Sequence, residues 1–441
     1  MTVTLVAWCT GAHADGVVIA DGSPHAIGRA GVGTVGDDGG GALLVNPAAI
    51  ARRDAGRIQL GVTLSDDSIN WRDGGGDHEE AHDQAASSAL PLIAYEGAVG
   101  SWIVAAGAMS SAASARTLRA PGELPPDELG NEFDYRYAGL AGGIRRDTLA
   151  IGAARRFGDV VAVGLSLAAS RVGVSETRRV WAGFAGRDVL EDPAHDIEIS
   201  IDAADNFVPS AVAGVLVAPP GTRVELAASI GYSANAFVHG NALATGNAPD
   251  VVVQPGAPTA RMELREPLTL RSGARWLGSH WSFEVDGDLW LLPHDAETAT
   301  WRIDGLAIQD ITGVDAGIGR LRSRASEQTH GAVRGALDVE LVAGFLWATA
   351  GYAFTTQGTA TADLSPTFGQ LPGQTAALGL ELTAGGFTAT FGWARTWWLY
   401  RTPAVTTMTL DNPFGTGDAS VPLGRYGGSS DQVGIVVDAE L

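Results

Sequence analysis

Apolar and polar residues alternate with a period of two along most of the chain after residue 56. In one such stretch Phe283 and Leu289 share a face, while Glu284 and Asp288 share the opposite face. This alternation predicts β-strands with one apolar face. A soluble β-sandwich alternates in the same way, so the strand count and the connections must decide the architecture. The clearest stretches are 57–64, 223–230, 281–291, 337–341 and 433–441.

Short and long connections alternate between the expected strands. Seven long loops and six tight turns require fourteen strands, with residues 134–156 taken as one strand. An even strand number, with long loops on one rim and short turns on the other, is typical of outer-membrane barrels. The sequence therefore predicts an all-β fold, a 14-stranded antiparallel transmembrane β-barrel. Tight turns are expected near 96–98 and at 157–159, 219–221, 277–279, 344 and 385–386, and long polar loops at 72–85, 111–133, 181–197, 241–261, 296–327, 359–373 and 403–424.

The first 55 residues do not alternate. Residues 1–14 contain a short apolar stretch, and Ala12-His13-Ala14 has the small-x-small form that precedes signal-peptide cleavage. We expect a signal peptide there; its basic start is missing, which leaves the true start open. The Gly-rich residues 15–55 are expected to form an N-terminal hatch that plugs the lumen, because fourteen strands otherwise enclose an open channel. Residues 56–441 form the predicted barrel.

Composition excludes several classes of protein. The chain carries 50 acidic and 29 basic side chains, a formal net charge of −21, and this surface repels nucleic-acid phosphates. No apolar run reaches the about 18 residues that a membrane-spanning helix needs. The single cysteine, Cys9, excludes a disulfide framework and a thiolate metal site.

Two sequence motifs match the patterns of nucleotide-binding and zinc-protease sites, but their surroundings do not fit such sites, and a third motif is absent. Residues 31–36 fit the dinucleotide fingerprint G-x-G-x-x-G, but the acidic, Gly-rich residues 37–41 follow where a phosphate-binding helix would begin. His78-Glu79-Glu80-Ala81-His82 fits the zinc-protease pattern H-E-x-x-H, but it follows three glycines and lacks an apolar helix face. No serine nucleophile elbow occurs. We predict no catalytic residue, no resident metal, no cofactor and no enzymatic activity.

The acidic loop 73–83 has two interpretations at this point. It is either a solvated acidic loop or a surface site that holds Ca²⁺ or Mg²⁺ between lipopolysaccharide phosphates.

The N-terminal region resembles a known family. Residues 23–33 lead through Asp37-Asp38 to Asn46-Pro47-Ala48, and this order resembles the hatch of the FadL family of outer-membrane transporters for long-chain fatty acids and other hydrophobic compounds. The hairpin 211–230 and the stretch Gly424-Arg425-Tyr426 before the last strand resemble the same family. Two features differ: the chain ends in Leu441 and not in an aromatic residue, and its long loops lack obvious apolar helices.

The resemblance implies passive uptake of a hydrophobic small molecule in the outer membrane of a Gram-negative bacterium. The ligand would enter the lumen and leave sideways through a gap at a kinked third strand, about residues 99–110, where Gly100 and Gly107 are the candidate kink glycines. The implied partners are membrane lipid, lipopolysaccharide and the barrel-assembly machinery, with the protein a monomer. The alternative is a permanently plugged barrel that acts as a surface receptor or adhesin through its long loops.

The Asn46-Pro47-Ala48 box and Arg29 lead to separate expectations. Asn46 and Pro47 are a common turn pair, so an architectural role for Asn46-Pro47-Ala48 is favoured over direct ligand contact. Arg29 inside a plug needs an acidic partner, and Asp37 or Asp38 would supply it.

Overall fold

The fold is described from a computed structural model of the chain. The described residues are 23–52, 56–72, 80–82, 87–118, 134–137, 139–183, 195–246, 251–292, 299–310, 312–322, 328–359, 371–401, 407–409, 420–422 and 424–441. The expected signal peptide, residues 1–14, lies outside them.

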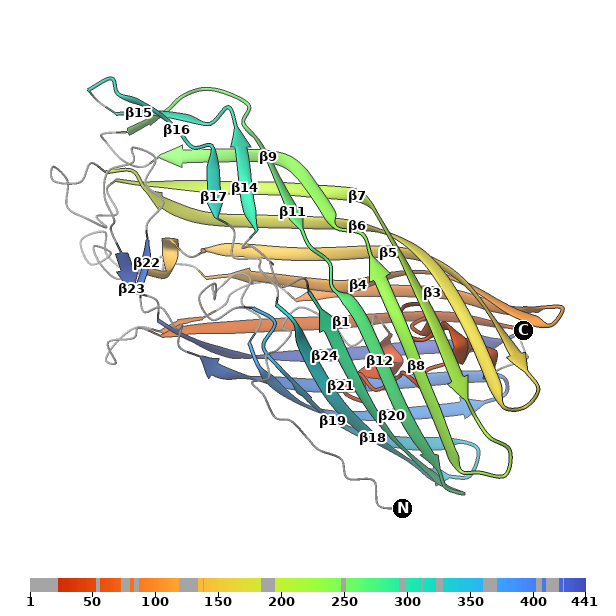
Figure 1. Ribbon diagram of the computed structural model, residues 1–441. Coiled ribbons are helices and arrows are strands. Elements are labelled where there is room, and N and C mark those ends of the chain that lie inside the picture. The colour runs from red at the N-terminus through yellow and green to blue at the C-terminus, as the bar shows by residue number, and fades with distance from the viewer. Residues whose placement is uncertain are drawn as a thin grey trace, which may run out of the picture.

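A closed barrel of fourteen antiparallel strands dominates the structure (Figure 1). Two of the fourteen are interrupted: β7 pairs with β8 through Ser210–Val217 and with β9 through Ile197–Ala204, so β8 and β9 form one barrel strand. β11 pairs with β9 and β12 pairs with β8, so β11 and β12 also form one barrel strand. The ring closes where β24 pairs with β1. The strands are β1 (Arg57–Arg72), β3 (Ser88–Val99), β4 (Trp102–Thr117), β5 (Ala141–Phe157), β6 (Val161–Trp181), β7 (Asp196–Val217), β8 (Val224–Ser233) with β9 (Ala236–Gly246), β11 (Thr259–Leu264) with β12 (Leu268–Leu277), β13 (Trp281–Leu291), β18 (His330–Val342), β19 (Leu346–Thr355), β20 (Gly373–Ala384), β21 (Phe387–Arg401) and β24 (Arg425–Glu440).

The predicted strand count and the segregation of connections are confirmed. Tight turns join strands at one end of the barrel, the short-turn end, and long segments join them at the other, the long-loop end. The region around Arg145-Arg146-Asp147 is part of one strand, β5, as expected. One turn differs, because β3 continues to Val99 and the chain reverses at Gly100-Ser101 and not near 96–98.

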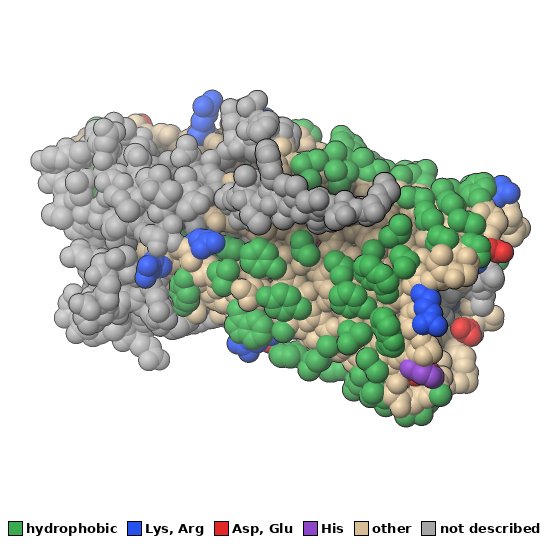
Figure 2. All heavy atoms as spheres, turned by 60° about the horizontal axis from the view of Figure 1, so that its bottom comes forward, with side chains coloured by type: hydrophobic (Ala, Val, Ile, Leu, Met, Phe, Trp, Pro, Cys, Tyr) green, Lys and Arg blue, Asp and Glu red, His purple; other side chains and the backbone are tan. Residues whose placement is uncertain are grey.

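Side-chain direction follows the predicted alternation. On β1, Leu60 and Leu64 are exposed on the outer wall, whereas Gln59 and Thr63 are buried inside. Figure 2 shows one outer face, where apolar side chains cover the middle of the wall and charged side chains lie toward its two ends. An apolar wall around a polar interior is the arrangement of a barrel that faces lipid. Within the described ranges, no helix is long and apolar enough to cross a membrane.

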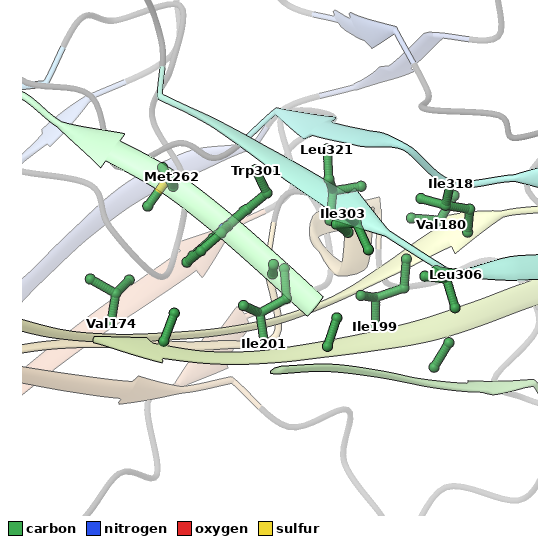
Figure 3. Close-up of a cluster of buried hydrophobic side chains, with 14 of the residues drawn as sticks. Val174, Val180, Ile199, Ile201, Met262, Trp301, Ile303, Leu306, Ile318 and Leu321 are labelled. Carbon is green, nitrogen blue, oxygen red and sulfur yellow. The ribbon is translucent and has the colours of Figure 1, made fainter. Parts of the chain in front are cut away.

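A second β-layer packs against the inner side of the barrel at the long-loop end (Figure 3). Trp301 and Ile303 of this layer are buried against Val174 and Ile201 of β6 and β7, and the indole Nε1 of Trp301 donates to Glu176 Oε2 at 2.7 Å. This apolar cluster gives the long-loop end a packed β core. The layer and its neighbours comprise β10 (Val251–Val253), β14 (Thr300–Asp304), β15 (Ala307–Asp310), β16 (Asp315–Gly317) and β17 (Arg320–Arg322); elsewhere lie β2 (Glu80–His82), β22 (Thr407–Thr409), β23 (Ser420–Pro422) and the 3-10 helix η3 (Asp134–Tyr137).

Residues 23–52, which we call the N-terminal segment, lie inside the barrel toward the short-turn end (Figure 1). The segment contains α1 (Pro24–Ile27), α2 (Ala42–Val45) and the 3-10 helix η2 (Pro47–Arg52). Its helices span only four to six residues, too short to be stable alone, so contacts with the surrounding strands must hold them.

Candidate functional site

Ion pairs fasten the N-terminal segment to one half of the lumen. Arg29 is buried and donates to Glu284 Oε2 at 2.6 Å and to Asp338 Oδ2 at 2.5 Å, on β13 and β18. The expectation that Asp37 or Asp38 would pair with Arg29 is wrong, because the barrel wall supplies nearer carboxylates. Asp38 pairs instead with Arg57 of β1, at 3.1 Å.

The glycine-rich stretch 31–36 also binds carboxylates of the wall. The backbone N–H groups of Gly33 and Thr34 donate to Asp286 Oδ2 at 2.8 and 2.9 Å. Those of Val35 and Gly36 donate to Glu284 Oε1 at 2.8 and 3.1 Å. Four consecutive N–H groups thus form an anion-binding nest. Its anions are two protein carboxylates, which accounts for the resemblance of the stretch to a phosphate-binding loop.

Asn46 organises the Asn46-Pro47-Ala48 box as a turn. Its Nδ2 donates to the carbonyl oxygen of Thr34 at 2.8 Å, and its Oδ1 accepts from the N–H of Ala48 at 3.2 Å. The box packs directly on Gly164 of β6 and Gly214 of β7, where a Cβ would overlap Pro47 and Asn46 respectively. The contacts of Asn46 thus hold the turn together and attach it to the preceding part of the segment and to the barrel wall.

His25 adds a titratable contact. Its Nε2 lies 3.3 Å from Glu381 Oε2 of β20, and its Nδ1 lies 3.9 Å from Asp37. Burial disfavours the charged imidazolium, but the hydrogen bond with Glu381 and the charges of Asp37 and Glu381 outweigh burial and raise the pKa of His25 to about 9. His25 is therefore positively charged at neutral pH.

The barrel wall is discontinuous between its second and third strands. β3 pairs with β4 from Leu92–Met109 to Val99–Trp102, whereas β3 continues along β1 from Ser88 and β4 continues along β5 to Thr117. Within the described range 87–118, no ladder pair joins β3 before Leu92 to β4 after Met109. We call this discontinuity the β3–β4 break.

A bulge and a proline mark the β3–β4 break. The register of β4 against β5 shifts between Ser110 and Ala112, so Ser111 is the extra residue. On β3, Pro91 is the first residue beyond the paired stretch, and proline has no N–H for a ladder. Of the two candidate kink glycines, Gly100 lies in the turn with φ +63°, and Gly107 pairs with Ala94 and Ala150. The irregularity in the third strand therefore lies at Ser111.

Side chains span the β3–β4 break where the ladder is missing. Inside, Arg116 Nε and Ser114 Oγ of β4 donate to Asp67 Oδ2 of β1 at 2.8 and 3.2 Å. Outside, Arg145 Nη1 of β5 reaches over β4 to the carbonyl oxygen of Ala89 on β3, at 3.3 Å. Such contacts separate more easily than a continuous backbone ladder, because each one breaks independently.

Apolar surface lies on both sides of the wall beside the break. Inside, Leu44 of the N-terminal segment packs against Leu92 and Met109, the last ladder pair. Outside, an apolar groove of about 750 Å³ runs over β3, β4, β5 and β6, with Ile93 and Leu149 among its lining residues. Sequence analysis placed the irregularity in the third strand but missed the part of β3 in it; Pro91 inside an alternating strand was the signal that could have located it.

The described residues give no support for a metal site at the acidic loop or elsewhere. Residues 73–79 and 83 of the acidic loop lie outside the described residues, and of the loop only the backbone of β2 is described. In the part of the chain that is described, no group of three or more His, Cys, Asp or Glu side chains is placed to hold a metal ion.

Comparison with solved structures identifies the fold. A FadL homologue of Pseudomonas aeruginosa superposes with a TM-score of 0.72 at 13% identity, over 96% of this chain and 99% of that one. The toluene transporter TodX of P. putida gives 0.69 at 14% identity, over 96% and 99%. The toluene transporter TbuX of Ralstonia pickettii gives 0.64 at 13% identity, over 96% and 99%. Neither a family model nor a curated protein sequence matches the chain. The chain is therefore a fourteen-stranded barrel with the fold of the FadL homologue and of the toluene transporters.

Proposed function

We propose that the protein is a passive transporter in the outer membrane of a Gram-negative bacterium, and that it takes up hydrophobic small molecules by lateral diffusion through the barrel wall. The β3–β4 break carries this proposal, because it is a side exit flanked by apolar surface within the apolar band. The exit favours apolar cargo, because transfer of each methylene group from water to an apolar environment is favourable by about 0.8 kcal/mol. A polar lumen blocked by the N-terminal segment offers no such gain.

The proposed route has three parts. The ligand enters from the long-loop end, passes Leu44, Leu92 and Met109 at the inner side of the break, and leaves over Ile93 and Leu149 outside. The N-terminal segment acts as a hatch that shifts near Leu44 while its ion pairs hold it elsewhere. No step requires a catalytic residue, a cofactor or an energy source, and we propose no enzymatic activity.

The ligand is a long-chain fatty acid or an aromatic hydrocarbon. The structural neighbours support this range, since they are described as a FadL homologue and as toluene transporters. The protein acts as a monomer that the barrel-assembly machinery inserts among lipid and lipopolysaccharide.

Two observations favour a second candidate function, a plugged surface receptor or adhesin. The long-loop end carries a packed second β-layer, and buried ion pairs fasten the N-terminal segment. A barrel that never opens would have both features. The two candidates differ in whether anything passes the β3–β4 break.

Deletion of Ser111 tests the proposal. The deletion removes the extra residue of β4, which allows its register against β5 to run without a shift and β3 to pair further along β4. Uptake of labelled long-chain fatty acids and toluene would be measured in a Gram-negative host lacking its own fatty-acid porin. We expect uptake by the wild type and by Ser111→Ala, which keeps the bulge. We expect uptake by the deletion variant to be at least tenfold lower.

A heat-modifiable barrel of each variant on an electrophoresis gel controls for folding. Equal uptake by the deletion variant would contradict exit through the break. No uptake by a correctly inserted wild type, with either class of ligand, would favour the receptor or adhesin.

A further inference from the structure

The apolar groove outside the break owes its shape to small residues on β4. Ala106, Gly107 and Ala108 lie between larger outward side chains, Ile93 on β3 and Leu149 on β5. The resulting hollow of about 750 Å³ falls in the usual size range for small-molecule sites, about 300–1,000 Å³. The groove therefore has room for a single chain-like molecule on the outer wall.

Charged side chains lie just beyond one end of the groove, next to its lining residues. Toward the long-loop end, the outward positions that follow Leu149 on β5 and Ala169 on β6 are Asp147 and Arg171, which are direct cross-strand partners. Arg145 Nε donates to Asp147 Oδ1 at 3.0 Å, and Ser110 Oγ also donates to that oxygen. Asp147 is thus already satisfied by β4 and β5, and the group of Asp147, Arg145 and Arg171 carries one net positive charge.

The guanidinium of Arg171 is exposed, and its charge attracts Asp147 without a hydrogen bond or a close ion pair to any residue that the structure describes. Its Nη1 lies beside Gly173, the next outward position toward the long-loop end. The nearest acid on the neighbouring strand β7, Asp205, accepts instead from the N–H groups of Phe207 and Phe237 at 3.0 and 2.8 Å. At the edge of the apolar band an outward arginine is tolerated, and it can bind water or an anionic head group there.

Arg171 lies at the height where an anionic head would lie. Ten residues separate it from Val161 at the start of β6. At about 3.3 Å per residue and a tilt of about 40°, this corresponds to about 25 Å along the membrane normal, the height of the apolar band. A molecule with its head at Arg171 and its chain in the groove would therefore lie in the orientation of an amphiphile in a membrane leaflet.

We propose that this groove is a binding site for a single-chain carboxylic acid, a long-chain fatty acid, on the outer wall beside the exit. The carboxylate binds the guanidinium of Arg171, whose planar fork matches it, and the chain fills the hollow over Ala106–Ala108. The inference rests on the proposed transport function and specifies its ligand. An uncharged aromatic hydrocarbon would form no ion pair with Arg171. A lipid with several acyl chains is too large for the groove.

Photo-crosslinking of the purified, full-length barrel in detergent tests the site. The probes are a diazirine-bearing sixteen-carbon fatty acid and its methyl ester, and labelled peptides are mapped by mass spectrometry. We expect the acid to label the peptides of β4, β5 and β6, and the uncharged ester to label them roughly tenfold less, since a charge-assisted contact is lost. Arg171→Gln should reduce labelling by the acid about tenfold, whereas Arg171→Lys should retain most of it.

Arg261→Gln is the matched control, because Arg261 is an exposed arginine on β11 and its change should leave labelling unaltered. Equal labelling by acid and ester, or no effect of Arg171→Gln, would overturn the proposal. Displacement of the acid by phosphatidylglycerol as effectively as by unlabelled palmitate would also overturn it, since the groove would then be a membrane-lipid site. The assay needs no transport, so a failure of uptake in cells counts against the proposed function alone.

Discussion

Arg116 of β4 pairs with Asp67 of β1 at 2.8 Å, although β3 lies between these two strands in the barrel. The pair takes over part of the role of the missing ladder, because it ties β4 to the wall beyond the β3–β4 break. Both side chains are buried or nearly so, so that removal of either partner would leave the other charge uncompensated.

Asp67→Asn should loosen the wall at the break. The change removes the charge partner of Arg116 and weakens the acceptor of Ser114, at a cost of about 1–3 kcal/mol. We expect faster amide hydrogen exchange in Ser88–Pro91 and Ser110–Thr117, and faster ligand uptake. Asp431→Asn, which removes an exposed ion pair within a regularly paired stretch of β21 and β24, should change neither. Unaltered exchange in Asp67→Asn would contradict the role assigned to the pair of Arg116 and Asp67.

Pro91→Ala should narrow the break. Alanine supplies the N–H that proline lacks, and one added ladder hydrogen bond contributes about 1 kcal/mol net. We expect a fall in uptake of roughly fivefold, measured as the initial rate with labelled ligand. Pro209→Ala on β7 is the control, because Pro209 lies in another strand beside a different register shift; an equal fall there would show that the effect is not specific to the break.

Gly214→Ala should displace the Asn46-Pro47-Ala48 box. A methyl group at this position would overlap Asn46 Oδ1, and overpacking of this kind costs about 1–3 kcal/mol. We expect a lower temperature for heat modification and faster proteolysis of the N-terminal segment. Gly287→Ala offers a comparison, since the nearest atom to its new methyl group would be 3.8 Å away; a similar loss there would mean that any strand glycine is sensitive.

The contact of His25 with Glu381 makes docking of the N-terminal segment dependent on pH. The pKa of His25 is about 9 in the folded protein against an ordinary 6.5, so the stabilisation is complete below about pH 6.5 and disappears as pH rises through about 9. Proteolysis of residues 23–30 should therefore accelerate between pH 8 and pH 10 beyond the intrinsic change of the protease. His25→Gln should remove that acceleration; its persistence would assign the pH dependence to another group.

The barrel could be predicted from the sequence because its signals are local. Alternation on β1, β13 and β24 and the lengths of the connections fix the strand count without knowledge of tertiary contacts. The partner of Arg29 could not be predicted, because Glu284 is 255 residues away in sequence and reaches Arg29 only through the closure of the barrel. The break was expected in the correct strand but at glycines; the structure has a bulge at Ser111 opposite a proline, two features that require the register of three strands to be known.

The carboxylates that hold the N-terminal segment have an electrical consequence. Glu284 and Asp286 accept from four backbone N–H groups of the segment, and Glu284 also binds Arg29. A barrel emptied of residues 23–52 would expose these charges to water as an acidic constriction, which attracts cations. Planar-bilayer recordings of such a deletion variant should show a cation-selective conductance that the intact protein lacks. If so, the contacts that position the segment also prevent ion leakage, and the proposed exit at the β3–β4 break would let cargo leave without displacing the segment from these carboxylates.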